Sequence, residues 1–477
     1  MRFSVILTLA CVLALVGCTT SERSSPTEKN QKSQASAVQP SGNASDPKEA
    51  SQQALPTYAD AARYLSAGEV DKAITVFESI VKRNPGDIES QVQFARLLIS
   101  AGRLPEARSV LERVLAQAPD NRGAQYSMAL LEGASGNDAK ELTLLEGIVS
   151  RYPADAEANA SLGQIYLGRN DTEKARAAFT RSLKADPNNI AALLGEGEIL
   201  LNVDSKPKEA LADFDRAVKL QPELSLAYAD RAEAEVGLND VSGAEKDFTK
   251  AISLNPGYYW HYIDRGKLRL VFEHDRKGAL ADFNEAVKLE PGYFLGYIYR
   301  GGVYDELGDR AAAMADYQKL LSLRPDYYFV YRPYAVLLYE QKDWSRAREY
   351  FLKTFKADPT DFGPEFLAVI TYLKQGNKVD ATALLTRLAG ELPQSSLFYA
   401  LARLYLEPGS DTSFLAKLQA ERNPDVRTRM LFYLACFYEL HGKTELAQRY
   451  FFDVQARPVE GMYEYKLNEA ELQNYKR

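Results

Sequence analysis

Prolines recur along most of the chain at intervals of 34 or 35 residues. A small residue, alanine in every case but one, stands twelve positions before each proline, and the exception is Glu141. Self-similarity at this period is the signature of a repeat array, in which each repeat buries its apolar face against its neighbours. The prolines that define the period are Pro85, Pro119, Pro153, Pro187, Pro222, Pro256, Pro291, Pro325, Pro359 and Pro393.

Within each period the apolar residues follow helical spacing. When the proline is numbered as position 32, apolar or small residues recur at positions 4, 7, 8 and 11, and again at 20, 24 and 27. Each set forms one face of a helix. In the fourth period, where "GRNDTEKA" separates the two sets, the matching residues are Leu162, Gly163, Tyr166, Ala175, Phe179 and Pro187. The pattern predicts an all-α chain of helical hairpins, with the glycines at position 8 lying at close helix crossings.

This spacing resembles that of tetratricopeptide (TPR) repeats. The resemblance covers residues 56–395 as ten TPR units, called repeats one to ten below, and it implies a right-handed superhelical solenoid of helical hairpins. Residues 396–458 fit as degenerate TPR units, since the template recovers in "FYLACFYELHGKTELAQRYF". Residues 459–477 are predicted to form a C-terminal capping helix that covers the exposed end. The C-terminal part is also similar to the NlpI-type TPR lipoproteins, which act as adaptors for envelope enzymes.

The first residues indicate export and lipidation. Arg2 precedes the apolar run "FSVILTLACVLALVG", which is too short to span a bilayer comfortably. The run ends in "LVGC", which resembles the lipobox of bacterial lipoproteins, where the cysteine is acylated and becomes the mature N-terminus. We therefore expect a lipoprotein signal peptide over residues 1–17 and a lipid on Cys18 that binds the bilayer. A soluble secreted protein cleaved nearby and an uncleaved signal anchor are the alternatives.

Residues 18–55 differ in composition from the rest of the chain. Ser, Thr, Gln, Asn, Lys and Pro predominate, and hardly an aliphatic residue occurs before Leu55. Such a segment cannot bury enough apolar area to offset its ordering entropy, so it is predicted to be a disordered tether after the lipidated cysteine. By resemblance to Gram-negative sorting rules, Thr19 favours the outer membrane, on either its periplasmic or its surface face.

The charge pattern and the rarity of histidine argue against several functional classes. The formal net charge is −7 and the acidic and basic residues are mixed, so the basic surface that nucleic acid requires is not expected. The three histidines are scattered, and Cys436 and His441 lie about 140° apart around a helix. We therefore expect no enzyme activity, no metal and no cofactor. The sequence gives no indication of the oligomeric state.

Arginines and aspartates recur at fixed positions in consecutive repeats. Arg231, Arg265 and Arg300 occupy position 7, on the packed face of the first helix. An unpaired charge at such a position is costly, so we expect internal ion pairs rather than a ligand-binding ladder. The predicted carboxylate partners, each one residue before the aromatic residue at position 24, are Asp213, Asp247, Asp282 and Asp316.

The stretch "NPGYYWHYIDRGKL" contains rings of two kinds. Tyr262, at position 4, is predicted to pack within its hairpin, while Tyr258, Tyr259 and the equivalent Tyr328 are predicted to fill joints between repeats. Trp260 is at position 2, and in TPR proteins positions 2, 5, 9 and 12 line the concave groove that receives a partner peptide. In repeats seven to ten this stripe is mostly apolar, which is typical of an interface.

The predicted partner-binding groove therefore lies in repeats seven to ten. Its residues are Trp260, Ile263, Ile298, Phe329, Arg332, Tyr339 and Phe366. The alternative is that the solenoid itself or its C-terminal helix covers this stripe. Pro333, at position 6, predicts that the first helix of repeat nine begins late. The pair of Lys and Asn with which TPR proteins grip a C-terminal carboxylate occurs in no repeat.

These features predict a membrane-anchored TPR scaffold or adaptor in a bacterial cell envelope, which binds other proteins or peptides through its groove. The alternative function is a surface-exposed adhesin that attaches to host or neighbouring cells. The same lipid anchor serves both faces of an outer membrane, so the sequence leaves both functions open.

Overall fold

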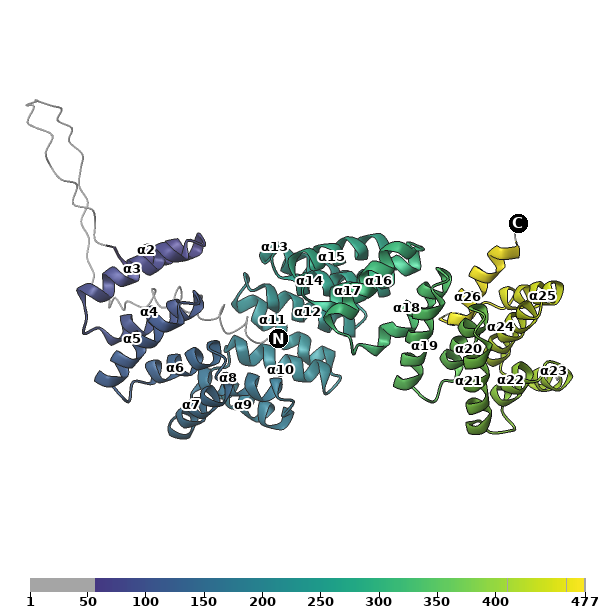
Figure 1. The fold of residues 1–477 in the computed structure, drawn as a ribbon. Helices are drawn as coiled ribbons and strands as arrows, with labels where there is room; N and C mark the ends of the chain where they lie inside the picture. Colours follow the sequence, from purple (N-terminus) through teal and green to yellow (C-terminus); the bar gives the residue numbers. More distant parts are fainter. Residues whose placement is uncertain (1–55, 410, 460, 476–477) are drawn as a thin grey trace, which may run out of the picture. The chain divides into compact units, whose positions relative to one another are not determined.

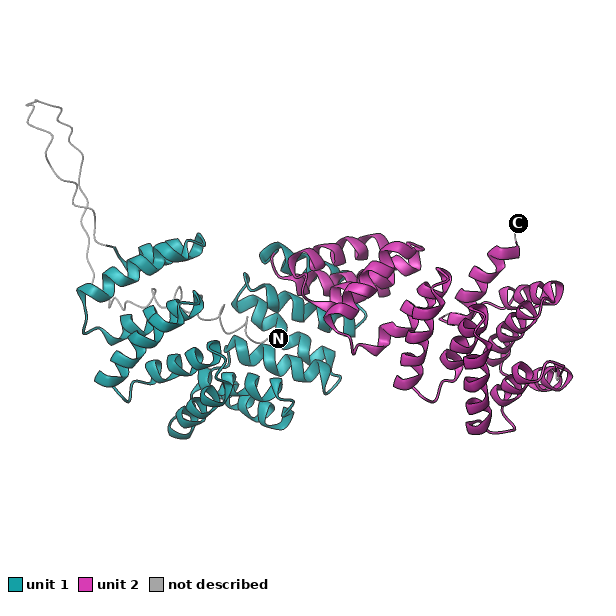
Figure 2. Ribbon diagram, viewed as in Figure 1, with its two compact units in different colours: residues 1–256 teal, residues 257–477 magenta. Residues whose placement is uncertain are grey.

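The computed structural model describes residues 56–409, 411–459 and 461–475. They form 25 α-helices and two short 3-10 helices, and no strand is present among them. The chain separates into two compact units, Met1–Pro256 and Gly257–Arg477 (Figure 2). The predicted signal peptide, Cys18 and the tether lie outside the described residues. Within the described part, no helix combines the length and the apolar character needed to cross a membrane.

Unit 1 is a row of helical hairpins whose helices follow the predicted repeats (Figure 1). The second helix of each hairpin packs against the first helix of the next one. First helices of neighbouring repeats also meet, α4 with α6, α8 with α10 and α10 with α12. The described helices are α2 (Tyr58–Ser66), α3 (Val70–Arg83), α4 (Ile88–Ser100), α5 (Leu104–Gln117), α6 (Arg122–Ala134), α7 (Asp138–Arg151), α8 (Ala156–Gly168), α9 (Thr172–Ala185), α10 (Ile190–Asn202), α11 (Pro207–Leu220), α12 (Ser225–Gly237) and α13 (Val241–Leu254).

Unit 2 continues the hairpin pattern and ends in a single helix. Its first part consists of α14 (Tyr259–Val271), α15 (Arg276–Leu289), α16 (Phe294–Leu307), α17 (Arg310–Leu323), η1 (Tyr328–Val330), α18 (Tyr331–Glu340), α19 (Trp344–Ala357), α20 (Gly363–Lys374) and α21 (Lys378–Glu391). Its C-terminal part consists of α22 (Leu397–Leu406), α23 (Asp411–Ala420), α24 (Pro424–Leu440), α25 (Thr444–Gln455), α26 (Tyr463–Leu472) and η2 (Gln473–Tyr475).

Two local signals recur in the hairpins. The first is a polar N-cap on the first helix, whose side chain accepts a backbone N–H that the helix leaves unpaired. In repeats two to five these caps are Asp87, Asn121, Asp155 and Asn189. The second is a left-handed residue in the turn between the two helices, such as Gly102 at φ 73° or Asn170 at φ 60°. Glycine and asparagine adopt this conformation at the least cost and hold this position in most turns, while Ser205, His274 and Lys342 hold it in three others.

The glycines at position 8 lie directly under the aromatic ring at position 24 of the same repeat. These rings are fully buried. A Cβ atom on any of the three glycines would overlap the ring, so the two helices approach closely only because no side chain intervenes. The predicted close crossings are therefore confirmed. The pairs are Gly163 with Phe179, Gly197 with Phe214 and Gly266 with Phe283.

The recurring arginines form the predicted internal ion pairs. Each guanidinium makes two hydrogen bonds to the aspartate of its own repeat, at distances between 2.6 and 3.1 Å. The carboxylate side chains are at most 11% exposed. Two parallel N–H···O bonds are the strongest geometry for such a pair, which satisfies charges on the packed face. The pairs are Arg231 with Asp247, Arg265 with Asp282 and Arg300 with Asp316.

Asp213 departs from this series. In repeat five position 7 is Glu196 rather than arginine, and Glu196 pairs with Arg176 at 3.2 Å. No ion pair of Asp213 is present in the described part of the chain. Burial raises the pKa of Asp213, and burial, with a contribution from Asp213, also raises the pKa of Glu196. The prediction that Asp213 pairs with an arginine is wrong, because its repeat has a second carboxylate in the arginine position.

Candidate functional site

Three of the seven predicted groove residues are buried. Ile263 is 1% exposed, Tyr339 2% and Phe366 1%. Ile263 is enclosed in the packing of α14, where its neighbours Asp264 and Gly266 are buried as well. The prediction that these three line an open groove is therefore wrong, since apolar side chains at helix interfaces lose their solvent when the helices pack.

In repeats nine and ten the stripe faces the C-terminal helices of the same unit. Helix α26 packs against α18, and α24 packs against α20 and α26 (Figure 1). The hydroxyl of Tyr339 on α18 donates a 2.5 Å hydrogen bond to Glu471 on α26. On α20, Phe366 packs its ring against that of Tyr433 on α24, with centroids 5.8 Å apart. The C-terminal helices therefore close the groove in these two repeats.

Two further predicted residues take part in internal contacts. Ile298 is half-buried and packs against the core of unit 2. Arg332 is half-buried, lies 2.6 Å from the carboxylate of Asp361, and has its guanidinium over the ring of Tyr463, 5.4 Å from the centroid. The predicted late start of the first helix of repeat nine is confirmed, because the 3-10 turn η1 precedes α18. This late start does not open the groove.

Lys374, at the end of α20, is a mostly buried cation in the closed groove that pairs with two carboxylates. Its ammonium lies 2.7 Å from Glu439 and 2.9 Å from Glu471, and its side chain is 12% exposed. Burial lowers the pKa of Lys374, but the attraction of Glu471 and Glu439 outweighs burial and holds the pKa above its ordinary value. The ammonium therefore stays charged, and Glu471 has three partners, Lys374, Tyr339 and Asn474.

A second carboxylate on the same face of α26 is bound two helical turns before Glu471. Glu464 accepts a 2.8 Å hydrogen bond from the hydroxyl of Tyr433 and lies 3.3 Å from the guanidinium of Arg429. The same guanidinium is 3.3 Å from Asp361. Glu464 and Glu471 are each 4% exposed, so the groove encloses both carboxylates almost completely. Chemically, this is a surface that recognises two acids on one helix.

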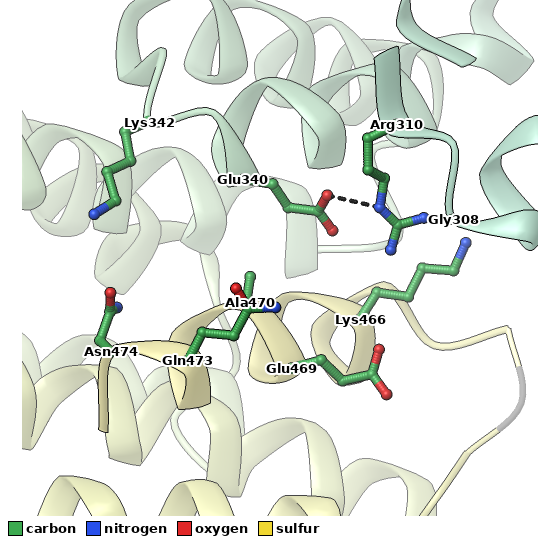
Figure 3. A pocket seen from close by; sticks show the side chains of 9 residues that line it. All are labelled: Gly308, Arg310, Glu340, Lys342, Lys466, Glu469, Ala470, Gln473 and Asn474. Carbon is green, nitrogen blue, oxygen red and sulfur yellow. Dashed lines mark ion pairs between the residues drawn. The ribbon is translucent and has the colours of Figure 1, made fainter. Parts of the chain in front are cut away.

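A polar pocket of about 800 Å³ lies along the outer flank of α26 (Figure 3). One wall comes from α26 and η2, and the other from the turns after α16 and α18. Arg310 and Glu340 form an ion pair of 3.0 Å across the second wall, and Lys466 lies 2.9 Å from Asp305. The lining residues are Gly308, Arg310, Glu340, Lys342, Lys466, Glu469, Ala470, Gln473 and Asn474. Sequence reasoning missed this pocket, because its two walls are far apart in the chain.

The two remaining predicted residues, Trp260 and Phe329, belong to a continuous row of aromatic rings in unit 2. Successive rings contact one another with centroid distances between 4.0 and 6.0 Å. The guanidinium of Arg324 lies 5.0 Å from the ring centroid of Phe294. We call this set the aromatic row; its members are Tyr258, Tyr259, Trp260, Tyr293, Phe294, Tyr327, Tyr328 and Phe329.

The row forms because each of its rings follows a repeat proline by two to four residues. Equivalent positions of stacked repeats lie on the same edge, so Tyr259 contacts Tyr293 and Phe294 contacts Tyr327 across neighbouring joints. Most rings of the row are half-buried, but Tyr328 is 47% and Phe329 63% exposed. The placement of Tyr328 inside a joint is therefore wrong, because the η1 turn carries this ring outward.

Comparisons with known proteins identify the repeats. Three family models of the tetratricopeptide repeat match the chain, over residues 64–131, over residues 142–190 and 160–225, and over residues 296–327. Together with the consecutive hairpins of both units, these matches show an all-α TPR helical-hairpin fold. TPR repeats mediate contacts between proteins, so the chain has the fold of a protein-binding scaffold.

Several solved structures resemble parts of the chain. PilW, described as a widely conserved type IV pilus biogenesis factor, is 15% identical over 43% of this chain and 95% of its own, with a TM-score of 0.40. A TPR protein from Parabacteroides merdae is 18% identical over 51% and 96%, with a TM-score of 0.38. YrrB, described as a TPR protein with an unusual peptide-binding site, is 19% identical over 46% and 95%, with a TM-score of 0.25.

Proposed function

We propose that this TPR protein is a binding scaffold for other proteins, anchored in a bacterial cell envelope by a lipid on Cys18. The "LVGC" motif and the polar segment that follows it support the anchor. The buried thiol of Cys436 supports binding rather than nucleophilic catalysis, because burial raises its pKa and disfavours the thiolate. The partner is a protein or peptide, bound by the aromatic row.

The observation that carries this proposal is the exposed end of the aromatic row. Tyr328 and Phe329 stack on each other at 4.0 Å and are both exposed, at 47% and 63%. Two adjacent exposed rings cost free energy in water, and burying them against a partner recovers it. Aromatic side chains are also the residues that most often dominate binding energy at interfaces. The row behind them holds both rings at a defined edge.

The row is tested by alanine substitution at its exposed end. Phe329→Ala should leave the melting temperature within a few degrees of wild type, because the side chain is mostly in solvent. It should weaken capture of cross-linked envelope partners by at least about fivefold, since an interface anchor contributes more than about 1 kcal/mol. Trp260→Ala should weaken the same capture.

The matched control for this test is Phe452→Ala on α25. Phe452 is 51% exposed in the same unit but does not belong to the aromatic row. If Phe452→Ala lowers capture as much as Phe329→Ala, exposed rings bind nonspecifically and the row is not the site. If Phe329→Ala captures the same partners as wild type, the proposal for the row is wrong.

A further inference from the structure

Helix α26 fills the closed groove with an unusual set of side chains. Five of its residues are at most 4% exposed, and they are spaced as i, i+3, i+4, i+7 and i+8, which is one face of a helix. Three of the five are polar. They are Glu464, Leu467, Asn468, Glu471 and Leu472. The helix is therefore held through two leucines and a set of specific polar contacts.

The groove contacts this face at matching positions. Tyr433 and Arg429 bind Glu464, at 2.8 and 3.3 Å. Seven residues, or about 10 Å of helix, further along, Tyr339 and Lys374 bind Glu471, at 2.5 and 2.9 Å. The groove thus presents two sets of a hydroxyl and a cation at the spacing of two acids on one helix.

Polar contacts of this kind determine which helix fits more than how tightly it is held. Removing two carboxylates and two cations from water costs nearly as much as their attraction returns. The amide of Asn468 donates to the carbonyl oxygen of Phe451 at 3.1 Å, which adds one more directional contact. A helix held this way is selected by charge and register, and a second helix with the same face can compete for the same contacts.

The surroundings of α26 bear on whether another helix can replace it in the groove. On its outer flank, Glu469 and Gln473 are exposed and line the polar pocket of about 800 Å³, whose other wall carries Arg310 and Glu340 (Figure 3). The connection from α25 includes Pro458 and Gly461, the latter at φ 77°, so α26 begins as a new helix, which folds back and packs against α25. Departure of α26 therefore breaks its contacts with α25, while α25 remains packed against α24.

We propose that α26 is an internal ligand of this groove, which an acidic amphipathic helix of a partner protein displaces. The partner helix carries two acids seven residues apart, with leucine or another aliphatic residue three positions after the first acid. The groove formed by α18, α20, α24 and α25 is then a second binding site, separate from the aromatic row, and α26 keeps it closed until such a helix is present.

The test uses a fluorescent peptide with the sequence of residues 461–477 and the full chain. In the variant Glu464→Arg with Glu471→Arg, α26 loses its cation contacts while every groove residue is kept. We expect this variant to bind the peptide at least tenfold more tightly than wild type does. A peptide that carries the same two arginines should bind neither protein. Phe329→Ala in the same background should leave peptide binding unchanged, which separates this site from the aromatic row.

A second arm follows displacement in the unmodified protein. Excess peptide should accelerate amide hydrogen exchange in residues 463–472 at least fivefold and leave exchange in α18 unchanged. A charge swap tests the same contact if the double variant does not fold. The Lys374→Glu protein should bind a peptide with Glu471→Lys at least fivefold more tightly than it binds the unmodified peptide. If the double variant is folded and binds no peptide, or if exchange in α26 stays constant at saturating peptide, α26 is a permanent cap and the proposal is wrong.

Discussion

The hydroxyl of Tyr339 donates a 2.5 Å hydrogen bond to the carboxylate of Glu471, a residue 132 positions further along the chain. Tyr339 belongs to the stripe that forms the concave groove in TPR proteins, and Glu471 belongs to the last helix. Burial raises the pKa of Tyr339 well above its ordinary value, with a further contribution from Glu471, so the phenol keeps its proton and acts as the donor. Through this contact α26 covers the groove of repeats nine and ten, so the groove residues Tyr339 and Phe366 are buried.

Tyr339 and Lys374, two of the partners of Glu471, should contribute differently to stability. Tyr339→Phe removes one hydrogen bond from a buried carboxylate and should cost about 1 to 3 kcal/mol of unfolding free energy. Lys374→Met removes the cation from both Glu439 and Glu471 and should cost about 3 to 5 kcal/mol. Urea unfolding followed by circular dichroism measures both.

The control for this pair is Lys353→Met. Lys353 forms an exposed ion pair with Glu349 at 2.7 Å. The substitution should therefore lower the free energy of unfolding by less than about 1 kcal/mol. Equal effects of Lys374→Met and Lys353→Met would contradict the closed groove.

The ion pairs inside the repeats should be intolerant of removing one partner. Arg300→Leu leaves Asp316 buried without its two hydrogen bonds from Arg300, and we expect a loss of about 3 to 5 kcal/mol. Arg300→Leu together with Asp316→Leu should recover much of this loss, because no uncompensated charge remains. The exposed pair of Arg276 and Glu306 is the control, and Arg276→Leu should change unfolding by less than about 1 kcal/mol. A double variant no more stable than Arg300→Leu would argue against this explanation.

Glu141 stands at the position where the other repeats have a small residue. Its carboxyl group should make the free energy of unfolding depend on pH. Its carboxyl lies against Gly133, where a side chain would overlap it, so glycine makes room for the acid. Burial, with a smaller contribution from Asp138, raises the pKa of Glu141 to about 7 from 4.5. Between these values the folded chain keeps a proton that the unfolded chain has lost, so this group lowers stability as pH rises from 4.5 to 7.

Glu141→Gln should therefore stabilise the protein in a pH-dependent way. We expect a gain of about 2 kcal/mol at pH 8 that shrinks toward pH 4. Urea unfolding of wild type and variant between pH 4 and pH 8 measures the difference. Glu112→Gln, on the exposed side of α5, is the control and should give no such trend. A gain of the same size at pH 4 and pH 8 would contradict the role of the buried charge.

The anchor is tested at Cys18, which lies outside the described residues. Cys18→Ala should abolish metabolic labelling with a fatty acid and release the protein from the membrane fraction. Cys436→Ala should keep the label, since that thiol is fully buried. A Cys18→Ala protein that still labels, and still sediments with membranes after a carbonate wash, would show that the lipoprotein prediction is wrong.

Protease accessibility measures on which face of the outer membrane the protein lies. Protease treatment of intact cells should leave the protein undigested if it is a scaffold inside the envelope. Digestion without lysis would instead support the surface-exposed adhesin that the sequence leaves open.

Much of the architecture follows from the sequence, because the signals that set it are local. A proline every 34 or 35 residues and apolar residues at fixed helical spacing specify the hairpins, since each repeat buries the same positions. Gly163 and its equivalents predict close crossings because only a missing side chain allows them. Arg300 and its equivalents predict internal pairs because a charge on a packed face needs a partner.

Only the tertiary structure decided which predicted groove residues stay on the surface. An apolar or amphipathic stripe has the same sequence pattern whether a partner, a neighbouring repeat or the chain's own last helix covers it, because each of these removes the same area from water. Tyr339 and Phe366 are covered by α26 and α24, while Trp260 and Phe329 remain in the aromatic row. The covering helices lie about 70 to 130 positions away in the chain. No local spacing encodes that contact, which depends on how the repeats curve as they stack.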